Sequence, residues 1–256
     1  MDHLGLLPVA REAVALGRRI VTSRAPRSVT EKAERDLVTD IDLAVEEAVR
    51  GFLARETPDI GVVGEEHGGE RGELWWVLDP VDGTANFARG IPLTGISLAL
   101  VAGPSAVVAA IDLPFLDAVY TAVEGYGAYS GETRIGVSGV RDLGRAMVSV
   151  GDFAVGEGAG SKNRLRLSLL AALGSRAERV RMIGSAAADL AWVADGRLDA
   201  TVNLSNLPWD TMAGVLLVRE AGGLVLDTDG SDHTVESANT VALSPGLRDV
   251  LLGMLR

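Results

Sequence analysis

The chain has 256 residues, of which 47% are hydrophobic and 23% charged, so it can bury a sizeable core as a compact globular protein. Its net charge is −11 and its 24 basic residues are scattered, which argues against a nucleic-acid polymer as partner, because phosphate backbones bind clustered Lys and Arg. The absence of cysteine excludes disulfides and thiolate zinc sites, and it fits a reducing compartment.

The chain begins with two segments of helical periodicity. Residues 4–22 carry apolar side chains at helical spacing, and a second helical pattern covers residues 43–55. The polar stretch at 27–42 fits neither the helical nor the strand period, and we expect it to form a loop. Charged residues such as Arg11 and Glu12 interrupt the first segment, so it lacks the apolar core of a signal peptide or membrane span. We therefore expect a cytoplasmic protein with no membrane partner.

Short apolar runs from residue 60 onward predict strands. IGVV, WWVL, ISLALV, SAVVAAIDL, AVYTAV and GAYS follow one another with Gly or Pro between them, and several should form hairpins. After about residue 145 the strands alternate with helical segments, which is typical of an α/β unit. We therefore predict an N-terminal α+β half at residues 1–144 and a C-terminal α/β half at 145–256. We expect the Gly-rich stretch 152–163 to be a mobile loop.

Acidic residues stand where apolar segments end. They are Asp42 in TDID, Glu65 in VVGEE, Asp79 and Asp82 in DPVDGT, and Asp210 in PWDTMAG. Any one of them could be a helix cap or a solvated turn residue, since Asp favours both positions. Together, in a chain with no cysteine and only 3 histidines, they favour a hard divalent cation with oxygen ligands, Mg²⁺ rather than Zn²⁺.

The DPVDGT segment predicts a phosphate site beside that metal site. A proline stiffens the turn, so that Asp79, the Val81 carbonyl and Asp82 can face one side. Gly83 and Thr84 follow directly and offer backbone N–H groups and a hydroxyl to an anion. Paired cations in such a site lower the pKa of a bound water, neutralise the phosphate and stabilise the leaving alkoxide in an in-line displacement.

These motifs resemble those of the inositol monophosphatase family of Mg²⁺-dependent, lithium-sensitive phosphatases. The resemblance rests on DPVDGTANF preceded by Trp, on GEE upstream, and on WDTMAG followed by EAGG, and it extends over nearly the whole chain. It implies a fold of class α/β (α+β), a layered αβαβα sandwich of the inositol monophosphatase and fructose-1,6-bisphosphatase type. It also implies a homodimer that acts on a small-molecule phosphate monoester.

The resemblance further implies roles for individual residues and a requirement for two or three Mg²⁺ ions. The implied metal ligands are Glu65, Asp79, the Val81 carbonyl, Asp82 and Asp210. The implied catalytic residues are Glu65 and Thr84, which orient and deprotonate the attacking water, and Asp42, which supports a third, weaker ion or its waters. The residues implied to contact phosphate or alcohol are Gly83, Thr84, Gly184, Ser185, Ala186, Asn203 and Asp210.

Two departures from the animal members of the family bear on the substrate. A second threonine is replaced by Ala85, and an acidic residue that contacts the inositol ring is replaced by Asn203. We expect inositol monophosphate as substrate, with histidinol phosphate, fructose 1,6-bisphosphate or a 3′-phosphoadenosine nucleotide as alternatives for the same chemistry. In a non-enzymatic alternative the carboxylates bind cations only to hold the fold or to serve a regulatory partner. That role does not require Glu65 and Thr84 to accompany the metal ligands.

Overall fold

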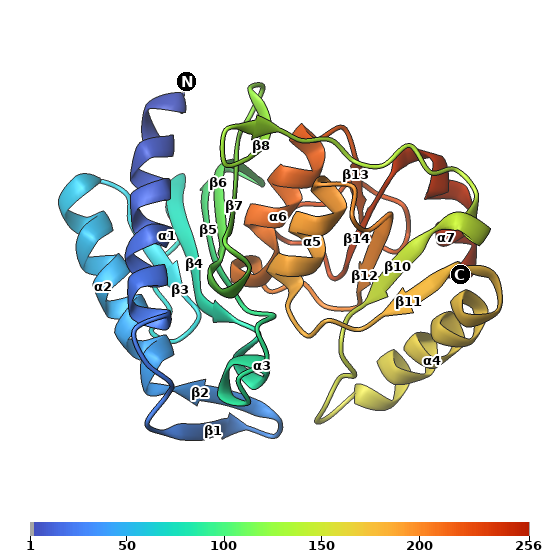
Figure 1. Cartoon of the computed structure of the whole chain (residues 1–256), viewed down its shortest axis with the longest axis horizontal. Helices are drawn as coiled ribbons and strands as arrows, with labels where there is room; N and C mark the ends of the chain where they lie inside the picture. Colours follow the sequence, from blue (N-terminus) through green and yellow to red (C-terminus); the bar gives the residue numbers. More distant parts are fainter. Residues whose placement is uncertain (1–2, 256) are drawn as a thin grey trace.

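The computed structural model describes residues 3–255, which form successive layers of helix, sheet, helix, sheet and helix (Figure 1). The predicted αβαβα sandwich is therefore confirmed. The outer helices on one side are α1 (Leu7–Val21) and α2 (Asp40–Glu56). The central helices are α5 (Ala186–Ala194) and α6 (Pro208–Glu220), and the outer helices on the other side are α4 (Ala159–Arg176) and α7 (Arg248–Met254).

The first sheet has seven strands in chain order. They are β3 (Gly61–Gly64), β4 (Leu74–Asp82), β5 (Gly95–Ala102), β6 (Ser105–Leu113), β7 (Ala118–Val123), β8 (Gly127–Ser130) and β9 (Thr133–Arg134). Strands β3 and β4 pair in parallel, and every later neighbour pairs antiparallel, as the predicted hairpins require. Short 3₁₀ helices flank some of these elements, at Leu4–Leu6, Pro114–Leu116, Leu143–Arg145 and Pro245–Leu247.

The second sheet has five strands in the order β11-β10-β12-β14-β13. They are β10 (Met147–Val150), β11 (Arg179–Arg181), β12 (Ala200–Asn203), β13 (Leu224–Leu226) and β14 (Thr240–Leu243). Strand β10 is parallel to both β11 and β12, as crossover helices between them require, whereas β14 is antiparallel to its neighbours. The division into halves at residues 144 and 145 stays a prediction, and its outermost residues 1, 2 and 256 lie outside the described residues.

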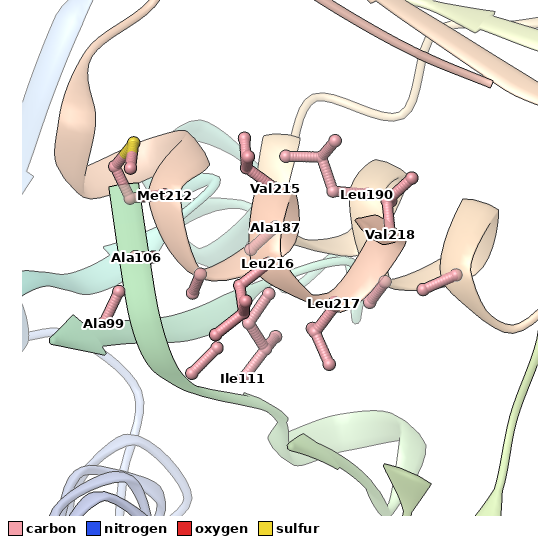
Figure 2. Packing of buried hydrophobic residues seen from close by; sticks show 14 of the residues in the cluster. Ala99, Ala106, Ile111, Ala187, Leu190, Met212, Val215, Leu216, Leu217 and Val218 are labelled. Atoms are coloured by element: carbon pink, nitrogen blue, oxygen red, sulfur yellow. The ribbon is translucent and has the colours of Figure 1, made fainter. Parts of the chain in front are cut away.

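The central helices carry apolar side chains all round because a sheet covers them on each side (Figure 2). Helix α6 buries Met212, Val215 and Leu217 among others. Helices α5 and α6 also approach each other closely, since a Cβ added at Gly214 would lie 2.3 Å from the Cβ of Leu190. This crowding explains the small residues of the AAADLAWVA helix. Within residues 3–255, no helix combines the length and the apolarity that crossing a bilayer requires.

One expectation from the sequence is wrong, and a second is wrong for part of its range. The stretch 27–42 contains a hairpin of β1 (Val29–Ala33) and β2 (Asp36–Thr39) and the first turn of α2, not a loop. Every residue of β1 is exposed, so the strand has no buried face to produce an alternating pattern. The Gly-rich stretch 152–163 is also partly helical, because α4 begins at Ala159 directly after Gly158, whose φ of 78° only glycine adopts readily.

Candidate active site

Asp79 and Asp82 lie at the end of β4, where the strand bulges. Asp79 pairs with Ser97 and Asp82 with Gly95, so two residues of β4 face one residue of β5 between these pairs. One of the two is Pro80, which has no N–H to give to the ladder. Both carboxylates are buried, and each lies on one side of the bulge.

Gly83 follows the bulge and begins the short helix α3 (Thr84–Ala88). Its φ is +88°, and a Cβ there would lie 2.9 Å from the carbonyl oxygens of Leu93 and Gly184. Only glycine therefore fits this position. Asn86 holds the Leu93 carbonyl close to this turn by donating to it from Nδ2 at 2.8 Å. The first N–H groups of α3 have no partner within the helix, so they are available to an anion.

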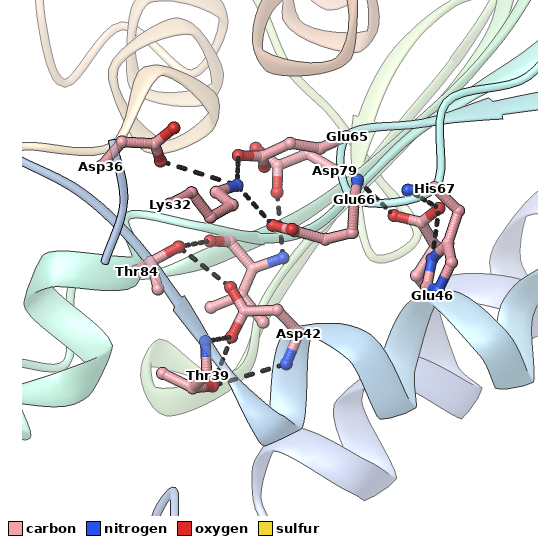
Figure 3. Close-up of polar contacts among 11 residues, drawn as sticks. Lys32, Asp36, Thr39, Asp42, Glu46, Glu65, Glu66, His67, Asp79 and Thr84 are labelled. Carbon is pink, nitrogen blue, oxygen red and sulfur yellow. Dashed lines mark hydrogen bonds and ion pairs between the residues drawn. The ribbon is translucent and has the colours of Figure 1, made fainter. Parts of the chain in front are cut away.

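Thr84 and Asp42 contact each other beside this turn (Figure 3). The Thr84 hydroxyl lies 3.0 Å from Asp42 Oδ1 and 3.0 Å from the carbonyl oxygen of Val81. The other oxygen of Asp42 accepts from the backbone N–H and hydroxyl of Thr39, in the capping box that starts α2. Burial raises the pKa of Asp42, and the hydrogen bonds from Thr39 and Thr84 oppose that rise.

Glu65 is positioned by a turn that a buried glutamate organises (Figure 3). Glu46 accepts backbone N–H groups from Glu66 at 2.8 Å and from His67 at 3.0 Å. A Cβ at Gly64 would lie 2.1 Å from Glu46 Oε1, so the first residue of the GEE motif must be glycine. His67, the residue after the GEE motif, lies in an exposed loop, and its ring contacts Glu46 rather than Glu65.

Lys32 reaches this cluster from the β1–β2 hairpin, a position that the sequence did not predict. Its Nζ lies 3.0 Å from Glu65 Oε1, 2.8 Å from Glu66 Oε1 and 3.5 Å from Asp36 Oδ1. Burial opposes the charge on Lys32, yet the two glutamates raise its pKa, so it stays cationic. The only signal in the sequence is that lysine is rare, since Lys162 is the single other one.

Asp82 is held by the start of α5. It accepts backbone N–H groups from Ala187 at 2.8 Å and Ala186 at 3.3 Å, and it accepts the hydroxyl of Ser185. Burial raises the pKa of Asp82 to about 6, although these three donors oppose the rise. Ser185 and Ala186 were predicted to contact the substrate. In the structure the Ser185 hydroxyl and the Ala186 N–H instead donate to Asp82, a predicted metal ligand.

The remaining carboxylates repel one another. Burial raises the pKa of Asp79 well above its usual range, and the charges of Glu65, Asp82 and Asp210 add to the rise. Asp210, in the first turn of α6, is raised in the same way by burial and by Asp82 and Glu65. Within residues 3–255, no three carboxylate or imidazole side chains converge into a ready-made ion site, and Lys32 is the cation that Glu65 contacts. The donor set itself, carboxylates and a carbonyl, fits Mg²⁺.

A pocket of about 200 Å³ adjoins Asp82 and Asp210. It brings together the predicted contact residues Gly184, Ser185, Ala186 and Asn203 with residues that the sequence did not predict. Of the latter, Asp152, Arg166 and Asp189 are charged. Arg166 and Asp189 did leave a signal, since each interrupts the apolar face of a helix that is otherwise buried there.

Comparison with known proteins gives consistent matches over nearly the whole chain. The sequence matches the Inositol monophosphatase family over residues 5–253. Inositol-1-monophosphatase ImpA of Mycolicibacterium smegmatis is 38% identical over 231 residues, which are 90% of this chain and 83% of that protein. Nus factor SuhB of Xylella fastidiosa is 39% identical over 229 residues, 89% of this chain and 82% of that protein.

Solved structures agree with these sequence matches. The extragenic suppressor protein suhB of Bartonella henselae has a TM-score of 0.92 and 30% identity, covering 98% of both chains. An IMPase of Thermotoga maritima has a TM-score of 0.87 and 29% identity, covering 100% of this chain and 97% of that one. The similarity therefore includes both sheets and all three helical layers.

Proposed function

The chain belongs to the inositol monophosphatase family and is a phosphatase, and we propose that it hydrolyses inositol monophosphate to the alcohol and inorganic phosphate with Mg²⁺. The observation that carries this proposal is the Thr84 hydroxyl, held at 3.0 Å by Asp42 within a cluster of mutually repelling carboxylates. Such a cluster attracts cations, and an oriented hydroxyl beside it can position a water for attack.

The proposed mechanism assigns the water to Thr84 and Glu65. The hydroxyl of Thr84 has one proton and donates more strongly to the carboxylate of Asp42 than to a neutral carbonyl. Its lone pairs then accept from a water. Glu65 is the base that takes the proton from this water, and burial raises its pKa toward the range that base catalysis needs. The free N–H groups at the start of α3 bind the phosphate oxygens.

Mg²⁺ would be held by the predicted ligands Glu65, Asp79, the Val81 carbonyl, Asp82 and Asp210. Bound there, it supplies the positive charge that neutralises the phosphate and acidifies water. The bulge of β4 orients three of these groups, and α5 fixes Asp82 against rotation. Lys32 competes with Mg²⁺ for Glu65, so we propose that the contact between Lys32 on the β1–β2 hairpin and Glu65 breaks when Mg²⁺ binds.

Family membership supports further proposals of the same kind. We propose two or three Mg²⁺ ions, a homodimer, a cytoplasmic location and inhibition by lithium. Li⁺ is close to Mg²⁺ in size with half its charge, so it should occupy the Asp79, Asp82 and Asp210 site after hydrolysis and inhibit uncompetitively with respect to substrate. Steady-state inhibition patterns test this, and a purely competitive pattern contradicts it.

The alternative to an enzyme is a non-enzymatic role. It is considered because a relative named as a Nus factor is as similar to this chain as one named as a phosphatase. Similarity over most of the chain to proteins named as inositol-1-monophosphatases supports the enzyme. Thr84 adds to this support, because its hydroxyl is not a predicted metal ligand and a cation-binding protein does not need it. No observation on this chain favours the second role specifically.

The test is release of inorganic phosphate from inositol 1-phosphate by the full chain, with Mg²⁺ and with excess EDTA. We expect turnover with Mg²⁺, its loss with EDTA, and its recovery when Mg²⁺ is restored. Histidinol phosphate, fructose 1,6-bisphosphate and 3′-phosphoadenosine 5′-phosphate complete the panel. Absence of phosphate release from all four compounds overturns the proposed function, and undiminished turnover in EDTA overturns its dependence on metal.

A further inference from the structure

Arg166 is buried at a position where a helix normally carries an apolar side chain. It lies on the inner face of α4 with Leu169 and Leu173, and only 2% of its surface is exposed. Its Nη1 donates to Asn163 Oδ1 at 2.9 Å, and its guanidinium lies 5.9 Å from the ring centre of Phe153. Its Nε has no hydrogen-bond partner. Burying an arginine without full pairing is costly, so its presence requires a reason.

Two other buried side chains also have a polar atom without a hydrogen-bond partner, and they line the same pocket as Arg166, the one beside Asp82 and Asp210. Asp189 on α5 and Asn203 on β12 are both more than nine-tenths buried. Asp189 Oδ1 and Asn203 Nδ2 have no hydrogen-bond partner. Unpaired buried polar atoms are rare in folded proteins, and here the three residues that carry them, one from each of three elements, line a single pocket beside Asp82 and Asp210. Their grouping indicates a ligand with several polar groups.

The charges of the lining indicate what kind of ligand this is. Among the described residues that line the pocket, Arg166 is the only basic one, and Asp82, Asp152, Asp189 and Asp210 are acidic. Asp82 and Asp210 are proposed metal ligands, which leaves Asp152 and Asp189 facing the alcohol. Alone, these two carboxylates would attract an ammonium group. The positive charge of Arg166 opposes such a group at short range.

A neutral polyol suits the same residues. Arg166 offers several N–H donors in a planar arrangement, Asp189 offers acceptors, and the amide of Asn203 offers both. Hydroxyl groups can pair with all three because each hydroxyl both donates and accepts. The pocket is also smaller than the roughly 300–1,000 Å³ that drug-sized ligands occupy, which favours a monosaccharide-sized alcohol over a nucleotide.

We propose that Arg166, together with Asp189 and Asn203, binds the alcohol half of the substrate and selects neutral polyols over alcohols that carry an ammonium group. This inference rests on the proposed phosphatase function and concerns the same site. Arg166 is its decisive residue, since it both donates to hydroxyls and repels cations. Replacing it with a neutral side chain should therefore weaken one class of substrate and favour the other.

The experiment compares kcat/KM for inositol 1-phosphate and for O-phosphoethanolamine in the presence of Mg²⁺. We expect the wild-type chain to favour inositol 1-phosphate, and Arg166→Met to lower the ratio of the two values by at least about tenfold. The matched control is Arg164→Met, on the exposed side of the same helix, which should leave the ratio unchanged. An Arg166→Met variant that folds and keeps the wild-type ratio within a factor of about two overturns the proposal.

Arg166→Lys covers the case in which Arg166→Met does not fold. Lysine keeps the charge but loses the planar set of donors, so this variant should still disfavour O-phosphoethanolamine while losing kcat/KM for inositol 1-phosphate. Wild-type kcat/KM values for both compounds in a folded Arg166→Lys variant overturn the role of Arg166 in binding. A wild-type chain that hydrolyses none of the phosphate monoesters overturns the proposed function itself, a result distinct from activity with unaltered ratios.

Discussion

The two halves of the candidate site are built in different ways. In the half around β4, polar atoms are held by the protein: Asp82 accepts from α5, Asp42 from Thr39 and Thr84, and the backbone N–H groups after Glu65 bind Glu46. In the alcohol pocket, Arg166, Asp189 and Asn203 each have an unpaired buried atom. Much of the first half is held in place before substrate arrives, as stabilisation of a transition state requires.

The second half leaves its hydrogen bonds to be completed by the ligand, as recognition requires. We therefore interpret the β4 half as the source of rate and the pocket as the source of selectivity. This division predicts that substitutions near β4 lower turnover of every substrate, whereas substitutions in the pocket change the preference among substrates.

The largest effect is expected from neutralising a carboxylate of the β4 half. Asp79→Asn keeps an oxygen that can accept the 2.9 Å bond from the Val81 N–H, so the bulge should persist, but one negative charge is lost. We expect kcat to fall by at least about a hundredfold for all substrates. Thermal stability without metal should rise, because repulsion by Glu65 and Asp82 decreases. Wild-type kcat at saturating Mg²⁺ contradicts the ligand assignment, and the exposed Asp249→Asn is the matched control.

Thr84→Ala should lower kcat by about a hundredfold while changing the affinity for Mg²⁺ little. The hydroxyl is lost, but the backbone N–H that faces the phosphate is retained. Thr84→Ser keeps the hydroxyl and should restore most of the rate. Calorimetric titration with Mg²⁺ alongside steady-state kinetics separates these effects. A loss of Mg²⁺ affinity as large as the loss of kcat would show that Thr84 supports the metal rather than the water.

Asp189→Asn should alter the dependence of stability on pH. Burial raises the pKa of Asp189 to about 7 from an unfolded value near 3.8, with opposition from the Ser149 hydroxyl. The folded chain therefore binds this proton more tightly, and stability decreases as pH rises from about 4 to about 7. The variant lacks this decrease, so its free energy of unfolding should exceed that of the wild type by about 1 kcal/mol or more at pH 8 and by little at pH 4. Parallel pH profiles of the free energy of unfolding for both chains would contradict this.

The smallest effect is expected at Asn203. A Cβ at Gly151 would lie 2.2 Å from Asn203 Oδ1, so the end of this side chain is closely packed on one side, and Asn203→Asp, which keeps its shape, is the informative change. An aspartate only accepts hydrogen bonds, so it should shift kcat/KM a few-fold between polyol and ammonium substrates while leaving kcat for each nearly unchanged. Identical ratios in the variant and the wild type would show that this amide does not contact the alcohol.

The same division separates what the sequence predicted from what it did not. The carboxylates at the end of β4 and the Gly83–Thr84 turn follow from consecutive residues, so the DPVDGT motif was sufficient to predict a site there, whereas the bulge and the φ of +88° at Gly83 are findings of the structure. The layered fold was implied by the resemblance to the inositol monophosphatase family, and the order of strands and helices indicated only the α/β half. The roles of these site residues stay predictions, although the structure brings Thr84 to Asp42 and Asp82 to α5.

The rest could not be predicted because it depends on long-range packing. Arg166 and Asp189 come from α4 and α5, and only the stacking of these elements brings them to the pocket beside Asn203, which the resemblance had already implied as a substrate contact. Lys32 lies on β1, a strand in which every residue is exposed, so neither its strand nor its contact with Glu65 had a periodic signal. The one local signal of the pocket in the sequence is a charged residue at a buried position of a helix, and similar sequences can be searched for it.

The division between rate and selectivity is tested most directly by comparing Thr84→Ala with Arg166→Met on inositol 1-phosphate and O-phosphoethanolamine. We predict that Thr84→Ala lowers kcat/KM for both compounds by the same factor, so their ratio stays at the wild-type value. Arg166→Met should instead change the ratio by at least about tenfold. A ratio that changes as much in Thr84→Ala as in Arg166→Met would contradict the account, because rate and selectivity would then belong to the same residues.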